Sequence, residues 1–169
     1  MLFRSRVGAE LRELTAAHDL SMWRVWAEIL CAWARAGGGD LHGGLAAAQE
    51  ALEARAGIGF LGMQPYFLAL VADLAVDAGR LDVADALVAQ GVSLAESSGE
   101  RIAEPELERV AGRLALARGD RDGARRALAR AFRTARSLGT PVTALHAARE
   151  LAALRATAGD PHALLAAAA

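Results

Sequence analysis

Three arginines are spaced so that they could act together on one negatively charged group. Arg109 and Arg113 are four residues apart, which places their side chains on one face of a helix. Arg149 follows Arg109 by 40 residues, an interval at which other residues of the chain also recur. Guanidinium groups bind carboxylates through paired hydrogen bonds. The sequence therefore predicts that the arginines converge on an acidic partner, with Asp73 and Glu106 holding them in register when no partner is bound.

Residue types that carry catalysis or metal binding are present but dispersed. None of the four histidines has a partner at reliable metal-ligand spacing: His18, His42, His146 and His162. His146 and Glu150 share a helix face, but two ligands alone are a weak signal. Cys31 stands alone, which excludes an intramolecular disulfide and predicts a buried, inert thiol. The stretch GIGFLG at 57–62 lacks the strand, lysine and Ser/Thr of a nucleotide site. We expect no enzyme, no cofactor and no metal.

The strongest charge signal is a run of arginines in the C-terminal half of the chain. Its members are Arg118, Arg121, Arg125, Arg126, Arg130, Arg133 and Arg136, against Asp120 and Asp122. Such a helix, predicted over 121–138, could bind phosphates or an acidic partner. The arginines are spread around the helix without interleaved aromatic residues, however, which favours a solvated outer face. Nucleic-acid binding is therefore the less favoured reading.

The composition points to a helical, water-exposed chain. Of its 169 residues 54% are hydrophobic and only 5% aromatic, so the apolar content is mostly Ala, Leu and Val, and Ala and Leu favour helices. No apolar run approaches the ~20 residues that span a membrane, and the start lacks the apolar segment of a secretion signal. With its lone cysteine, the chain fits the cytoplasm.

The chain repeats at an interval of 40 residues. A turn glycine recurs as Gly39, Gly79, Gly119 and Gly159, and a second glycine column contains Gly59, Gly99 and Gly139. Small residues precede the turn by seven positions (Ala32, Ala72, Gly112, Ala152) and follow it by five (Gly44, Ala84, Ala124). Glycine commonly closes helices, so each unit is predicted to be two helices ended by glycine turns.

The predicted helices follow from these columns and from the apolar spacing. They are expected near 5–17, 22–36, 41–56, 64–78, 81–98, 102–118, 121–138, 142–158 and 161–168. Four prolines lie near predicted helix starts, where a missing N–H group costs little: Pro65, Pro105, Pro141 and Pro161.

The column pattern resembles the tetratricopeptide repeat, a helix-turn-helix unit with small, Gly, small and small residues at offsets 0, +7, +12 and +19. The large aromatic residue usual at the fourth position is missing. The resemblance implies an all-α, right-handed solenoid of antiparallel helix pairs with about 40 residues per repeat. The implied single domain, 1–169, divides into a half repeat 1–18 and repeats of about 21–59, 60–99, 100–139 and 140–169.

Three short stretches of the sequence resemble a more specific group of repeats. "PYFLALVAD", "AGRLDVA" and "SGERIAEPELERVAGRL" resemble the C-terminal repeats of large bacterial signalling proteins that join an ATPase module to a cyclase or DNA-binding activator domain. The resemblance implies a non-catalytic interaction or scaffold role in signalling or transcription regulation. The alternative it leaves open is a regulatory domain that senses a small effector and controls an ATPase, cyclase or DNA-binding domain.

In tetratricopeptide arrays the first helix of each repeat lines a concave groove. The candidate groove residues here are Trp26, Trp33, Tyr66, Asp73, Glu106, Arg109, Arg113, His146 and Arg149. They change along the array from aromatic to ionic, which suits a peptide or protein segment with an apolar anchor. The alternative is that Trp26 and Trp33 pack against the N-terminal helix or a preceding repeat. Uncapped array ends also predict homo-oligomers.

Overall fold

The structure is a computed structural model that describes residues 2–18, 21–55 and 62–156. These residues form eight α-helices and no strand, which confirms the all-α class. The helices are α1 Leu2–Ala17, α2 Ser21–Gly37, α3 Leu41–Arg55, α4 Gln64–Asp77, α5 Leu81–Ser98, α6 Glu104–Ala117, α7 Arg121–Leu138 and α8 Pro141–Ala156, with a 3₁₀ turn η1 Arg101–Ala103 before α6. Their limits agree with the predicted ranges to within a few residues. The helix expected at 161–168 lies outside the described residues.

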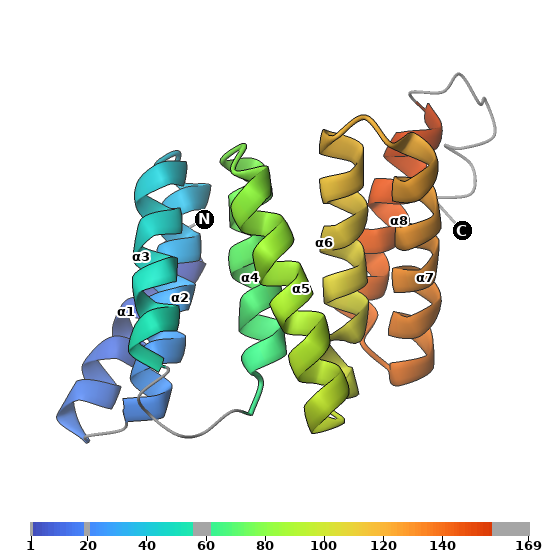
Figure 1. Cartoon of the computed structure of the whole chain (residues 1–169). Helices are drawn as coiled ribbons and strands as arrows, with labels where there is room; N and C mark the ends of the chain where they lie inside the picture. Colours follow the sequence, from blue (N-terminus) through green and yellow to red (C-terminus); the bar gives the residue numbers. More distant parts are fainter. Residues whose placement is uncertain (1, 19–20, 56–61, 157–169) are drawn as a thin grey trace.

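The helices pack in neighbouring pairs (Figure 1). The most extensive contacts join α2 to α3, α4 to α5 and α6 to α7, while α1 packs on α2 and α8 on α7. The helices α2, α4, α6 and α8 also contact one another in succession. In the view of Figure 1, α2, α4 and α8 lie behind α3, α5 and α7.

The recurring turn is built from a glycine and a capping aspartate. Gly79 and Gly119 have φ angles of +70° and +85°, a left-handed conformation that a side chain would strain. After Gly119, the carboxylate of Asp120 accepts a hydrogen bond of 2.8 Å from the backbone N–H of Gly123 and so caps the start of α7. Asp40 caps α3 through the N–H of Gly43 in the same way, at 2.9 Å. The equivalent position before α5 is an arginine, whose side chain makes no capping bond.

The small columns lie where helices approach closely. A Cβ atom added to Gly44 would lie 2.7 Å from the carbonyl oxygen of Ala32 on the paired helix, and one on Gly112 would lie 2.8 Å from Cγ of Leu128. Ala72 is fully buried. The sequence prediction that these columns permit close packing is therefore confirmed for these units. The glycine columns continue at Gly59 and Gly159, which lie outside the described residues.

Candidate functional site

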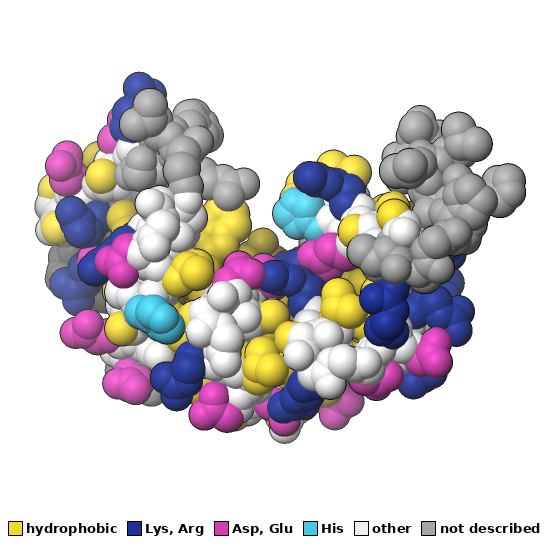
Figure 2. All heavy atoms as spheres, turned by 90° about the horizontal axis from the view of Figure 1, so that it is seen from above, with side chains coloured by type: hydrophobic (Ala, Val, Ile, Leu, Met, Phe, Trp, Pro, Cys, Tyr) yellow, Lys and Arg dark blue, Asp and Glu magenta, His cyan; other side chains and the backbone are white. Residues whose placement is uncertain are grey.

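The layer of α2, α4, α6 and α8 forms a hollowed face, here called the concave face (Figure 2). Charged side chains of both signs gather on its floor, and hydrophobic side chains are exposed toward the N-terminal side. The first helices were expected to line such a surface. It is the candidate site because it holds the predicted residues Asp73 of α4 and Glu106, Arg109 and Arg113 of α6 in contact with one another.

Arg109 lies at the centre of the charged residues and is almost fully buried, with a side chain that is 4% exposed. Its guanidinium group bonds three carboxylates from three helices. It donates to Glu106 on its own helix α6 at 2.6 Å and to Asp73 on α4 at 2.8 Å. A third bond of 2.6 Å reaches Glu150 on α8. The expected pairing of Arg109 with Asp73 and Glu106 is confirmed, whereas Glu150 as a partner was not predicted.

Arg113, one turn further along α6, extends this arrangement. It donates to Asp73 and to Asp77, both on α4, and its Nε atom lies 4.0 Å from the Glu150 carboxylate. These groups are called the ionic network below: Asp73, Asp77, Glu106, Arg109, Arg113 and Glu150. Four carboxylates against two guanidinium groups leave a formal charge of −2 in the network if all six groups are ionised.

The three arginines do not form the open anion site that the sequence predicted. Arg109 and Arg113 already have carboxylate partners within the chain, because Asp77 and Glu150 reach them in addition to the expected acids. Arg149 is exposed and makes no ion pair with the residues that the structure describes. It lines a shallow pocket of about 320 Å³ on α8 with His146 and Glu150. We therefore do not propose that these arginines bind an acidic partner.

Burial and charge act in opposite directions on these groups. Burial by itself lowers the pKa of Arg109, but the surrounding carboxylates raise it above its ordinary value, so the guanidinium is firmly charged. For Glu150, burial raises the pKa above its ordinary value of 4.5 and outweighs the opposing effect of Arg109 and Arg113. Its second carboxylate oxygen, Oε2, is buried without a hydrogen-bond partner in the described part of the chain.

The raised pKa of Glu150 predicts a specific pH dependence of stability. A carboxyl with a raised folded-state pKa stabilises the fold fully below pH 4.5, and this contribution is lost as the pH rises through the folded-state value. The free energy of unfolding of the parent minus that of Glu150→Gln should therefore fall from pH 4.5 toward neutrality. Urea titrations of both proteins at several pH values measure it. A difference that stays constant or rises would contradict the expected direction.

The aromatic residues occupy the other end of the concave face. Trp26 is partly buried, and its ring lies 4.8 Å from that of Trp23 and 5.1 Å from that of Phe67 on α4. Its Nε1 atom is buried without a hydrogen-bond partner among the described residues. Trp33 lines a pocket of about 450 Å³ between α2 and α4. Tyr66 stacks edge-on with Phe67 at 6.3 Å. These ring contacts lie within α2, within α4 or between the two helices, and the Trp26–Phe67 contact joins the first two helix pairs.

The arginine-rich helix α7 and the lone cysteine of α2 contribute nothing to the ionic network. The arginines of α7 are exposed around a buried stripe of small residues. Cys31 is partly buried, and burial raises its thiol pKa, which makes it less reactive. Within residues 2–18, 21–55 and 62–156, no group of three His, Cys, Asp or Glu side chains is placed to hold a metal ion. In the same ranges no helix is both long enough and apolar enough to cross a membrane.

The sequence did not predict Asp77 and Glu150 as members of the network, because the candidate groove residues were chosen only at equal positions in successive repeats. A signal for them does exist in the spacing. Asp73 precedes Arg113 by 40 residues, one repeat, and both Asp73–Arg109 and Asp77–Arg113 are separated by 36, one repeat less one helical turn. In comparisons with known proteins, no family model and no curated protein matches this chain.

Proposed function

We propose that the chain is a non-catalytic protein-interaction module whose concave face binds an extended segment of a partner protein. In this proposal the helix pairs form a right-handed, tetratricopeptide-like solenoid with repeats of about 40 residues. The observation that carries the proposal is the concave face itself, which combines an aromatic end with an ionic floor. The sequence resemblance adds a setting, namely the cytoplasmic signalling or transcription regulatory systems of bacteria.

The charge of the floor favours a basic partner segment. Both arginines of the ionic network are engaged, while Asp77 keeps a side chain that is 44% exposed and the network has a surplus of carboxylates. A lysine or arginine of a partner can pair with such a carboxylate, and an apolar neighbour can contact Trp33, which lines the same pocket as Asp77. The proposed ligand is therefore a segment with an apolar anchor and at least one basic residue.

A peptide-display selection against the purified protein tests this proposal. Enriched peptides should combine aromatic or large aliphatic residues with Lys or Arg. Asp77→Asn should weaken their binding about tenfold, the effect of losing one charge-assisted contact. The matched control is Asp85→Asn, because Asp85 forms an exposed ion pair with Arg118 away from the concave face. Enrichment of acidic peptides, or equal loss in both variants, would contradict the proposal.

Exposed apolar side chains on α1 and α8 support self-association as a further part of the proposal. Val142 and Leu145 on α8 are 66% and 58% exposed, and Leu14 on α1 is 58% exposed. Exposed large apolar side chains favour burial against a second copy. Light scattering should show dimers or larger species that dissociate in Leu145→Glu, and a concentration-independent monomer would exclude the association.

The second candidate function is the sensing of a small effector. It is favoured by a cavity between α6 and α8, which shares Arg113 and Glu150 with the ionic network. This function would make the chain a regulatory domain for an ATPase, a cyclase or a DNA-binding domain. The two functions differ in their ligand, a protein segment or a small molecule, and direct titration with each separates them.

A further inference from the structure

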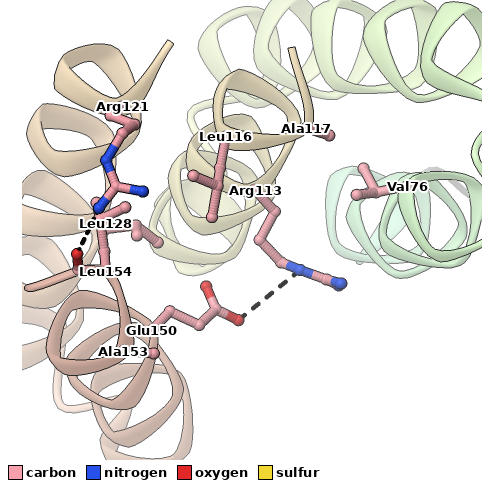
Figure 3. A pocket seen from close by; sticks show the side chains of 9 residues that line it. All are labelled: Val76, Arg113, Leu116, Ala117, Arg121, Leu128, Glu150, Ala153 and Leu154. Atoms are coloured by element: carbon pink, nitrogen blue, oxygen red, sulfur yellow. Dashed lines mark hydrogen bonds and ion pairs between the residues drawn. The ribbon is translucent and has the colours of Figure 1, made fainter. Parts of the chain in front are cut away.

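A cavity of about 440 Å³ lies between the C-terminal halves of α6 and α8 (Figure 3). Leu116, Leu128, Leu154 and Val76 supply most of its apolar wall, from four different helices. Its volume falls within the range of small-molecule sites, which are mostly apolar and carry few polar groups. The chemistry of those polar groups therefore decides which ligands it admits.

Three polar side chains line the cavity, and two of them are engaged. Arg113 is bonded to Asp73 and Asp77, and Arg121 donates a hydrogen bond of 2.8 Å to the carbonyl oxygen of Leu154. Arg113 is therefore not an open site for an anion, and the bond of Arg121 to the carbonyl holds its side chain against α8.

The third side chain is Glu150, and its two carboxylate oxygens differ. Oε1 accepts from Arg109 at 2.6 Å, whereas Oε2 is buried without a hydrogen-bond partner in the described chain. In Figure 3 the oxygen that carries no dashed line is directed toward the space beside Leu116 and Leu128. The cavity thus presents one unmet hydrogen-bond acceptor in an otherwise apolar wall.

An unmet buried acceptor selects for a ligand that brings a donor. An ammonium group donates hydrogen bonds and also carries the charge that the surplus of carboxylates in the ionic network attracts. A carboxylate ligand has no proton to donate and would be repelled by Glu150. An alcohol would meet the hydrogen bond without the charge.

We propose that this cavity is a binding site for a small primary amine with a compact apolar body, whose ammonium group donates to Oε2 of Glu150 while its carbon skeleton contacts Leu116 and Leu128. The site shares Arg113 and Glu150 with the ionic network, but Asp77, Trp33 and Tyr66 do not line it, so amine binding can be measured without a peptide. It supplies the ligand chemistry that the effector-sensing function requires.

Three probes of matched shape test the assignment: phenethylamine, phenethyl alcohol and phenylpropionate. Each is titrated into the isotope-labelled full chain near neutral pH, and amide chemical shifts report both affinity and location. Phenethylamine should shift residues of α6 and α8 and bind most tightly, with the alcohol about tenfold weaker for want of the charge. Phenylpropionate should leave these amides unmoved.

Two variants test whether the amine binds in the cavity. Ala153 is exposed and lines it, so Ala153→Trp should block binding by steric filling, while Ala89→Trp on the exposed side of α5 serves as the control that leaves binding unchanged. Glu150→Gln should weaken amine binding about tenfold and bring it close to that of the alcohol. The proposal is overturned if the amine produces no shift up to millimolar concentration, if phenylpropionate binds as well, or if both cavity variants bind like the parent. None of these outcomes depends on whether peptides bind the concave face.

Discussion

Arg109→Ala should destabilise the fold by about 3–5 kcal/mol, the effect expected when one partner of a buried ion pair is removed. The reason is that Asp73 and Glu106 lie almost buried beside the arginine, with side chains that are 15% and 6% exposed, and would lose its guanidinium group. Arg113 can still pair with Asp73, but no other cation contacts Glu106 in the described structure. Urea denaturation followed by the helical circular dichroism signal measures the change.

Arg149→Ala is the matched control for this prediction. Arg149 occupies the column of Arg109 one repeat later, yet it is exposed and makes no ion pair in the described chain. Its removal should change stability by no more than about 0.5 kcal/mol. Similar stabilities for the two variants would mean that the ionic network does not hold the helices together. Adding Glu106→Leu to Arg109→Leu should recover part of the loss, because it removes the buried carboxylate that has lost its cation and apolar replacements of buried ion pairs are often well tolerated.

The second large effect is expected where α6 packs closely against α7, at Gly112. Gly112→Leu should destabilise the protein by about 1–3 kcal/mol through overpacking. A Cβ atom at this position already lies 2.8 Å from Cγ and 3.3 Å from the backbone N of Leu128 on α7, so the larger side chain must push the two helices apart. The midpoint of urea denaturation reports the loss.

Ala117→Leu on the same helix is the control. It distinguishes the effect of overpacking a helix contact from the effect of introducing a leucine into α6. Ala117 is exposed at the end of α6, so the added side chain meets solvent and the midpoint should stay close to that of the parent. Should Gly112→Leu prove as stable as Ala117→Leu, the small columns would not mark close contacts, and the repeat alignment would lose its physical basis.

The helices were predictable because their signals are local. Gly79 and Gly119 end first helices through their own backbone conformation, and Pro65 and Pro105 lie in the first turn of α4 and α6. Such effects involve residues close in sequence and do not depend on how helices cross. The small columns were also predictable, since the residue size needed at a crossing recurs with the repeat.

The ionic network was only partly predictable because its contacts depend on the offset between neighbouring helices. The sequence shows that Asp73, Glu106 and Arg109 lie near one another, but a shift of one helical turn decides whether Asp77 also reaches Arg113. Glu150 follows Arg149, the residue in the predicted groove column. The orientation of α8 about its own axis directs Glu150, and not Arg149, to Arg109. Arg109 and Arg113, which were expected to bind an acidic partner, are therefore paired with carboxylates of the same chain.

The most direct test of the interaction surface is to map where a display-selected basic peptide binds. Amide chemical shifts of the labelled protein should change mainly in α2, α4, α6 and α8, with the largest changes near Trp33 and Asp77, and a charge-reversed peptide should leave them unmoved. Changes concentrated instead on the exposed arginines of α7, or a preference for the charge-reversed peptide, would contradict the account and move the interaction to the outer face.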